Sequence, residues 1–315
     1  MQESDNIKTS TDLDDEINVK ELFGVLFHAK WIIVFFITFT SIIGLLYSFY
    51  LPDIYKSKAL LVSVEVNNSG ISGGVGGLAG LAGISVPSIG GEDNSSKAIP
   101  KLSSLSFFEN NIMPNIFLPD LFAVKSWSSK TNDLVYDENI YNKKSNTWVR
   151  DYSYPKKQIP SAQEAYIKFI DEHFSLNENN KTGFITLTIK HQSPYIAKVW
   201  LELLVNEVNS FYRQKDKLES EKAVIYLYQQ IARTDLSEIK KVIAELLQEK
   251  MQKLTLIEVN QSYVFDYIDA PAVMEEKSEP GRALIFLASI FLGAILGIMF
   301  VVIKHYFLGK NFLLS

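Results

Sequence analysis

Two long apolar runs stand out in the pattern of hydrophobic and polar positions. Trp31–Leu51 and Ala283–Ile303 each contain no charged residue over 21 positions. At about 1.5 Å per helical residue, each would be about 31 Å long, which matches the hydrocarbon core of a bilayer. Lys30 and Asp53 flank the first run, and Arg282 and Lys304 flank the second. The pattern therefore predicts two transmembrane helices, at residues 31–51 and 283–303.

Small residues recur every fourth position in both runs, which would align them on one helix face. Such a face lets a second helix approach closely, although glycine is also common in membrane helices for other reasons. Pro280 and Gly281 precede the second run, where a proline lacking its N–H can begin a helix. The candidates for helix packing or partner contact are Thr40, Gly44, Ser48, Pro280, Gly281, Ser289, Gly293 and Gly297.

The segment between the two runs changes its periodicity along the chain. Ile54–Val66, Gly183–Lys190 and Tyr263–Ile268 are rich in β-branched and aromatic residues, and the second alternates with a period of two, typical of a half-buried strand. Asn94–Asn111 is expected to be helical up to Pro114. Ser161 begins a further helix ending near Phe174, because Ser161-Ala-Gln-Glu is a capping box.

A helical period replaces the strand period after Ser193, with no glycine or proline between Pro194 and Pro271. We expect an outgoing helix, a turn where Thr234 or Asp235 caps a returning helix, and a strand that rejoins the sheet. An outgoing helix of about 38 residues would reach about 57 Å. The expected fold class is an α+β membrane protein: two transmembrane helices flank an α/β base (52–190 and 259–282) with a projecting helical hairpin (193–258).

Three segments are expected to be less regular. Residues 1–30 form an acidic leader that includes an amphipathic helix over Asn18–Ala29, and residues 304–315 form a short tail. Gly70–Gly91 is glycine-rich and apolar, and is expected to be a flexible loop. Leu118–Ile159 is expected to be an irregular excursion in which Trp127 and Trp148 serve packing, with sugar stacking as the alternative.

The composition offers little catalytic chemistry. The chain has no cysteine, so thiol chemistry and disulfides are excluded. The net charge is −5, and the sequence has no basic patch suited to binding nucleic acid. The four histidines are scattered, and no metalloprotease, P-loop, EF-hand or nucleophile-elbow motif is present. We therefore expect a protein that is not an enzyme, with no catalytic, cofactor-binding or metal site and no cofactor.

Local strings in a fixed order resemble the bacterial polysaccharide co-polymerases, also called chain-length determinant proteins. The resemblance extends over nearly the whole chain. The matching strings are Pro52–Leu60 (PDIYKSKAL), Lys181–Ile189 (KTGFITLTI), Ser193-Pro194, Tyr226–Ile231 (YLYQQI), Tyr263–Pro271 (YVFDYIDAP) and Glu279–Leu284 (EPGRAL).

The resemblance implies a location and partners. It places the protein in the bacterial inner membrane, with residues 1–30 and 304–315 in the cytoplasm and residues 52–282 in the periplasm. Lysine and arginine are equally frequent near the two sides of the spans, so charge alone does not orient the chain. The family implies a homo-oligomer that works with a polysaccharide polymerase, with the growing lipid-linked glycan as a further candidate partner.

The implied function is regulation of the chain length of a surface polysaccharide. The sequence given ends 12 residues after the second span, which resembles the kinase-free class associated with lipopolysaccharide O-antigen. Two alternatives share the same topology: a two-span channel and a periplasmic ligand sensor. Neither span carries a charged residue to line a pore, and a sensor would need a partner to supply its cytoplasmic output.

Overall fold

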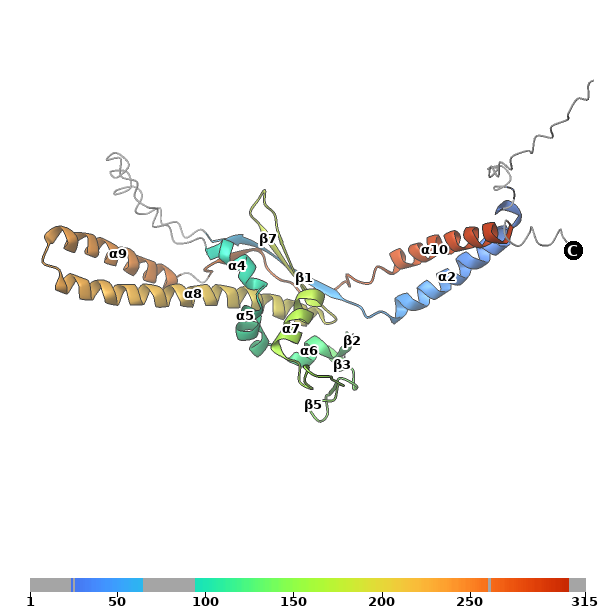
Figure 1. Cartoon of the computed structure of the whole chain (residues 1–315), viewed down its shortest axis with the longest axis horizontal. Helices are drawn as coiled ribbons and strands as arrows, with labels where there is room; N and C mark the ends of the chain where they lie inside the picture. The colour runs from blue at the N-terminus through green and yellow to red at the C-terminus, as the bar shows by residue number, and fades with distance from the viewer. Residues whose placement is uncertain (1–23, 25, 65–93, 260–261, 306–315) are drawn as a thin grey trace, which may run out of the picture. The chain divides into compact units, whose positions relative to one another are not determined.

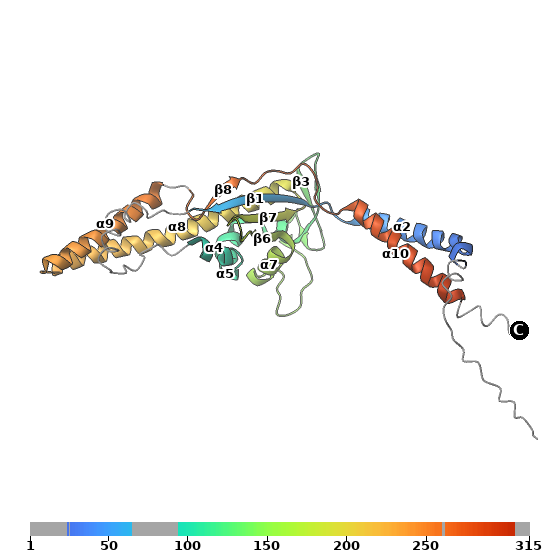
Figure 2. The ribbon, with the colours of Figure 1, turned by 90° about the horizontal axis from the view of Figure 1, so that it is seen from above.

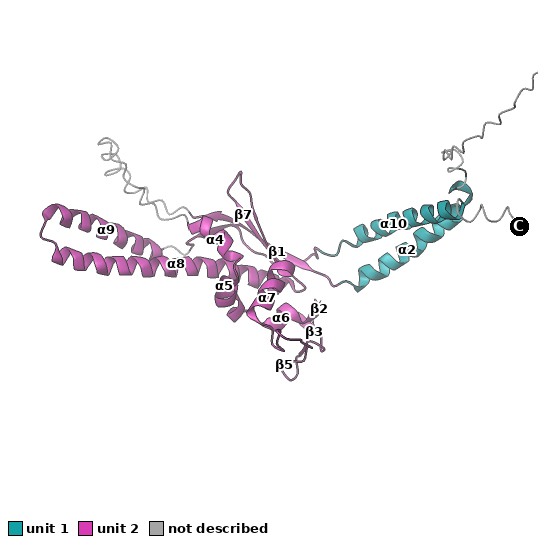
Figure 3. Ribbon diagram, in the orientation of Figure 1, with its two compact units in different colours: residues 1–51, 279–315 teal, residues 52–278 magenta. Residues whose placement is uncertain are grey.

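The computed structural model describes residues 24, 26–64, 94–259 and 262–305, so the predictions for Gly70–Gly91, for the tail and for most of the leader lie outside the described residues. The chain divides into two compact units (Figure 3). One contains Met1–Leu51 with Glu279–Ser315, and the other contains Pro52–Ser278. Each unit is described by itself below.

The first unit contains the two helices expected from the apolar runs. Helix α2 is Lys30–Tyr50 and helix α10 is Arg282–Ile303, and both are long and apolar enough to cross a membrane. Three pairs of residues are in contact between the helices: Gly44 with Ser289, Thr40 with Gly293, and Ile33 with Gly297. Residue numbers therefore increase along α10 in the direction in which they decrease along α2. The helices are therefore antiparallel, and Lys30 and Ile303 lie at the same end of the pair.

The second unit is built on a four-stranded antiparallel sheet with the strand order β6-β7-β1-β8. The strands are β1 (Tyr55–Ser63), β6 (Phe174–Glu178), β7 (Ile185–His191) and β8 (Phe265–Asp269). Strands β7 and β8 belong to one sheet, as expected, and β1 lies between them. Ile185, Leu187 and Ile189 are fully buried, but Thr188 on the opposite face is also buried. Thr186 and Lys190 on that second face are only partly buried, so β7 agrees with the half-buried strand that its alternation predicts.

Helix α8 (Pro194–Arg233) is the longest element at 40 residues, and Ser193 caps it. Its first half packs on strands β1 and β7, where its buried residues include Trp200, Leu204 and Val208. Helix α9 (Ser237–Val259) returns along the second half of α8 (Figures 1 and 2). The sequence assigned the whole of residues 193–258 to the projecting hairpin, whereas the structure places the first half of α8 in the core of the base.

The turn between α8 and α9 corrects one local prediction. Thr234 ends α8, and its hydroxyl donates to the Gln230 carbonyl over 2.8 Å. The carbonyl of Leu236 accepts from the N–H of Lys240 over 3.0 Å, which places Leu236 at the N-cap position of α9. Asp235 therefore does not cap the returning helix, because the helix begins one residue later than the capping-box pattern indicates.

Several short helices cover the base. The predicted helix over Asn94–Asn111 is broken into α4 (Asn94–Leu102), α5 (Leu105–Phe107) and two further turns that end at Asn115. Helix α7 (Ala162–Lys168) begins at the predicted capping box and continues as a π-helical turn to His173. Both irregular turns carry buried aromatic residues, Phe107 and Phe108 in one region and Phe169 in the other.

The excursion is more regular than expected. It contains α6 (Leu118–Phe122) and two hairpins, β2–β3 (Val124–Ser128 and Asp133–Tyr136) and β4–β5 (Tyr141–Asn142 and Thr147–Trp148). The turns contain Asn132 and Asn146 with φ of 56° and 57°, a conformation that asparagine tolerates better than most residues. Trp127 and Trp148 contact other aromatic rings, so packing accounts for both.

Candidate functional surfaces

The packing of α2 against α10 depends on the small residues identified in the sequence. A methyl group added at Gly293 would lie 2.1 Å from Thr40 Oγ1 and 2.7 Å from Ile37 Cα. One added at Gly44 would lie 1.9 Å from Ser289 Oγ. These separations are far below van der Waals contact, so the two backbones approach closely only because side-chain carbon is absent.

A hydrogen bond joins the same faces. Thr40 Oγ1 donates to the Ser289 carbonyl over 2.9 Å, and the rings of Phe36 and Phe300 contact each other with centroids 5.3 Å apart. In hydrocarbon, such interhelical hydrogen bonds and tight van der Waals contacts replace the hydrophobic effect as the attraction between helices. The small faces of the two spans thus meet each other within one chain.

The eight candidate residues do not all lie in this interface. The structure brings together Thr40, Gly44, Ser289, Gly293 and Gly297, and it buries Ser48. Pro280 and Gly281 lie before α10, which begins at Arg282, so Pro280 does not occupy the first helical position. A methyl group at Gly281 would lie 3.7 Å from Leu284 Cβ, an ordinary contact, so no close approach requires glycine there.

Sequence reasoning missed two buried members of the interface. Ser41 of α2 and Val301 of α10 are 9% and 3% exposed. On α2, Ile37, Ser41, Gly44 and Ser48 follow a spacing of four, three and four, the 3.5-residue period of packed helices. A search for that period, in addition to strict spacing by four, would have identified Ser41. On α10, Val301 simply continues the series that begins at Ser289.

The helix pair α8–α9 exposes apolar side chains beyond the base. Ile243 and Ile257 of α9 are buried, whereas many neighbours point outward. The exposed apolar residues of this part are Leu218, Ile225, Tyr226, Tyr228, Leu236, Ile239, Val242, Met251, Leu256 and Val259. An exposed apolar surface of this kind marks a site for contact with another protein surface.

A buried carboxylate fastens the root of the helix pair. Asp216 of α8 is 6% exposed, and its Oδ2 accepts from Lys253 Nζ of α9 over 3.0 Å, from Tyr263 Oη over 2.6 Å and from Asn94 Nδ2 over 3.0 Å. Burial raises the pKa of Asp216, but the hydrogen bonds from these three partners outweigh burial and hold the pKa below its usual range. The charged form of Asp216 thus joins four segments.

Two buried histidines fasten the excursion to the sheet. The N–H of Ser193 donates to His191 Nδ1 over 2.9 Å, so the Nε2 of His191 carries the proton and donates to the Asp120 carbonyl over 3.0 Å. His173 Nδ1 lies 2.7 Å from the Lys190 carbonyl. Burial lowers the pKa of His191 to about 3 and also lowers the pKa of His173. Both rings contact Trp200, and both are neutral at pH 7.

The histidines predict a loss of stability in mild acid. The unfolded chain binds protons below about pH 6.5, whereas the folded chain excludes them from these rings, so stability falls as the pH decreases from about 6.5 towards about 3. At pH 5, His191 alone should cost about 2 kcal/mol. Burial also raises the pKa of Asp120, which acts in the opposite direction at lower pH. We expect a lower Tm at pH 5 than at pH 7, measured on the full chain in detergent; an equal Tm would contradict this assignment.

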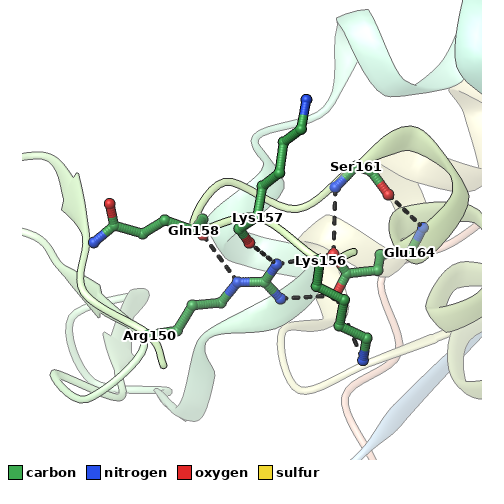
Figure 4. A network of polar contacts seen from close by, with 6 residues as sticks. All are labelled: Arg150, Lys156, Lys157, Gln158, Ser161 and Glu164. Atoms are coloured by element: carbon green, nitrogen blue, oxygen red, sulfur yellow. Dashed lines mark hydrogen bonds and ion pairs between the residues drawn. The ribbon is translucent and has the colours of Figure 1, made fainter. Parts of the chain in front are cut away.

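An arginine clamp organises the chain that leads into α7 (Figure 4). Arg150 Nη1 and Nη2 each donate to a carboxylate oxygen of Glu164 over 2.9 Å. The same guanidinium donates from Nε to the Gln158 carbonyl over 2.9 Å and from Nη2 to the Lys157 carbonyl over 2.5 Å. Glu164 also forms the capping box with Ser161, and the hydrogen bonds from Arg150 lower its pKa. The Arg150 side chain therefore ties the start of this loop, at residue 150, to its end, at residues 157–158, and to helix α7 at Glu164.

Replacing the planar guanidinium group of Arg150 should make this loop more mobile. In Arg150→Lys, a single ammonium cannot satisfy Glu164 and two carbonyls together. We expect trypsin to cleave after Lys156 or Lys157 at least about tenfold faster. If the free energy of local opening of the loop falls by about 1.4 kcal/mol, the open population that trypsin can cleave rises about tenfold. Arg233→Lys, the same substitution at an exposed position, is the control. Equal cleavage rates for Arg150→Lys and the unmodified protein would show that the clamp does not hold the loop.

The geometry defines a class of protein: a mixed α/β unit whose two ends continue into one antiparallel pair of apolar, membrane-length helices. Among the described residues, no group of three or more His, Asp or Glu side chains could hold a metal ion. The surfaces identified above are made for packing and contact.

The comparison with protein families agrees with the resemblance seen in the sequence. The model of the family described as "Wzz: Chain length determinant protein" matches residues 15–109, which include helix α2 and strand β1. The predicted resemblance to the chain-length determinant family is thereby confirmed. No curated protein matches the chain.

Two solved structures are similar at low identity. One is described as "full-length bacterial polysaccharide co-polymerase"; it is 12% identical, with a TM-score of 0.39, and the match covers 94% of this chain and 98% of that one. The other is described as a fragment of WzzB, polysaccharide co-polymerase from Salmonella Typhimurium. It is 12% identical, with a TM-score of 0.33, and the match covers 72% of this chain and 100% of that one.

Proposed function

We propose that this protein regulates the chain length of a bacterial surface polysaccharide, the O-antigen of lipopolysaccharide. The observation that carries the proposal is the match of residues 15–109 to the chain-length determinant family, because it includes both a membrane-length helix and the first strand of the base. The regulator acts through its surfaces, as a scaffold for the polymerase that joins lipid-linked repeat units, and it performs no chemistry of its own.

The proposed location is the bacterial inner membrane. Helices α2 and α10 are its two spans, residues 1–30 and 304–315 are cytoplasmic, and residues 52–282 are periplasmic. The antiparallel packing of α2 on α10 supports this arrangement, because it puts Lys30 and Ile303 at the same end of the pair. With both ends of Pro52–Ser278 attached to the spans, the mixed unit would stay close to the site of polymerisation.

The proposed working form is a homo-oligomer. The exposed apolar side chains of α8 and α9 support a homo-oligomer. The rest of the described chain leaves them exposed, and neighbouring copies would cover them. The close packing of α2 on α10 uses the small faces internally. The polymerase would then contact the outward faces of the spans, which carry residues such as Phe35, Phe39 and Phe291.

Deletion of the gene tests the proposal. We expect mutant cells still to make the polysaccharide but to lose its preferred length on a gel, and the unmodified gene supplied in trans should restore the preferred band. An unchanged ladder after deletion would refute chain-length regulation. Complete loss of polymer would indicate an enzyme or exporter instead.

A further inference from the structure

The loop of residues 151–159 is exposed along its whole length, and hydrogen bonds hold part of its backbone. All nine of its residues are exposed. Its carbonyls at Lys157 and Gln158 accept hydrogen bonds from Arg150, whose side chain is only 14% exposed. Within the loop, the N–H of Lys156 donates to the Ser153 carbonyl over 2.9 Å. Figure 4 shows Arg150 reaching both of those carbonyls and Glu164.

The loop displays aromatic and apolar side chains to solvent. Tyr154 is 97% exposed and Tyr152 is 58% exposed, and Ile159 is 61% exposed. A ring that lies in water contributes little to the stability of its own fold. A loop held in one shape with aromatic rings facing solvent is typical of a recognition surface, because little conformational entropy is lost when a ligand binds.

We propose that the loop of residues 151–159 binds a polysaccharide chain. A tyrosine ring offers a negative face to the C–H groups of a sugar ring, and its hydroxyl offers a hydrogen bond at the edge. Ser153, Lys156, Lys157 and Gln158 add donors suited to hydroxyl groups. This mixture of flat aromatic faces and many polar donors matches a ligand that is apolar on its ring faces and polar on its rim.

The same composition is less suited to other partners. A protein interface has an apolar core from which water is excluded, and Pro155 and Ile159 are the only aliphatic side chains in the loop. A lipid surface is attracted by clusters of four or more basic residues, whereas the loop has two lysines and Asp151 opposes them. The open, exposed shape also suits a polymer, which can pass across a surface without entering a pocket.

The inference rests on the proposed function and extends it to the substrate. A single small platform of this kind binds weakly, but copies of it in a homo-oligomer would meet several repeat units of one polymer. A longer chain would then engage more loops than a shorter one. Binding should therefore strengthen with polymer length, which is the quantity that a chain-length regulator must sense.

The test compares two double variants of the full-length protein in lipid nanodiscs. Tyr152→Ala/Tyr154→Ala removes the rings of the loop. Val135→Ala/Ile167→Ala removes two apolar side chains that are 48% and 49% exposed, on β3 and α7, outside both the loop and the α8–α9 surface, as a control. Binding of polysaccharide isolated from the same cells, separated into short and long fractions, is measured by saturation-transfer NMR and by titration.

We expect the loop variant to bind the long fraction at least about tenfold more weakly than the unmodified protein, and the control variant to bind within about twofold. Both variants should keep the unmodified Tm, since all four side chains are exposed. Equal binding by the loop variant overturns the proposal, and so does an equal loss in the control.

The outcomes separate this proposal from the function on which it rests. If deletion of the gene alters the polysaccharide ladder but the loop variant binds and regulates normally, only the loop assignment fails. If deletion leaves the ladder unchanged, the proposed function fails, whatever the loop binds.

Discussion

Gly293→Leu should separate the two membrane-length helices and abolish the preferred polysaccharide length while the protein still inserts. Even a methyl group at Gly293 would lie 2.7 Å from Ile37 Cα and 2.9 Å from the Phe36 carbonyl oxygen. Both are backbone atoms, so no side-chain rotation can relieve the overlap. Overpacking of this kind typically costs about 1–3 kcal/mol where neighbours can adjust, and here the helices themselves must move apart.

The measurements are the amount of protein in the membrane fraction, its Tm in detergent and the polysaccharide ladder of cells that carry the variant. The control is Ala288→Leu, which also introduces a leucine side chain but on the exposed side of the same helix. We expect Ala288→Leu to match the unmodified protein in the amount in the membrane fraction and in Tm. A normal ladder for Gly293→Leu would show that the close packing of α2 and α10 has no part in the function.

Asp216→Ala should give the largest loss of stability in the second unit. It removes the acceptor shared by Lys253, Tyr263 and Asn94, and leaves their donors without that partner. Breaking a buried ion pair by removing one partner costs about 3–5 kcal/mol, and Lys253 can partly regain water because its side chain is 31% exposed. We therefore expect a loss of about 3 kcal/mol and a Tm lower by about 6–12 °C.

The control for this prediction lies on the same helix pair. Lys217 of α8 and Glu258 of α9 also form an ion pair, but their side chains are 44% and 62% exposed. Exposed pairs contribute little, so Glu258→Gln should leave the Tm unchanged. Hydrogen exchange should also quicken in α9 of Asp216→Ala. If Asp216→Ala melts within about 1 °C of the unmodified protein, the buried carboxylate does not hold the root of the helix pair.

The elements predicted well from the sequence are those with a long, uninterrupted pattern. Helices α2 and α10 follow from 21 uncharged positions each, and α7 follows from the capping box at Ser161. Strand β7 follows from its alternation. In each case the signal is local, since the residues that define the element are neighbours in the chain.

The elements that were missed depend on partners far away in sequence. Strand β6 has no clear alternation and forms because it pairs with β7. The helix predicted over Asn94–Asn111 breaks at residues 103–104, before the buried Phe107 and Phe108. No spacing rule relates Arg150 to Glu164, or Asp216 to Lys253, because each contact exists only once the fold has brought two elements together.

The faces of small residues on α2 and α10 show how much of the candidate contact surface could be predicted from the sequence. Spacing by four at Ser289, Gly293 and Gly297 predicts that a helix can approach, and the structure shows a helix there. The pattern could not say which helix, because glycine faces accept a partner from the same chain or from another. That the partner is α2 follows only from the contacts of Gly44 and Thr40. A role of these faces in binding the polymerase stays a prediction.

We propose that both ends of the mixed unit are anchored in one membrane, with that unit on the far side from the termini. The chain has no cysteine, so single cysteines can be labelled without background. Lys130→Cys, exposed in the β2–β3 turn, should react with a membrane-impermeant maleimide once the outer membrane alone is permeabilised. Lys8→Cys and Lys310→Cys should react only after the inner membrane is broken. Reaction of Lys130→Cys and either terminal cysteine at the same stage would contradict the account.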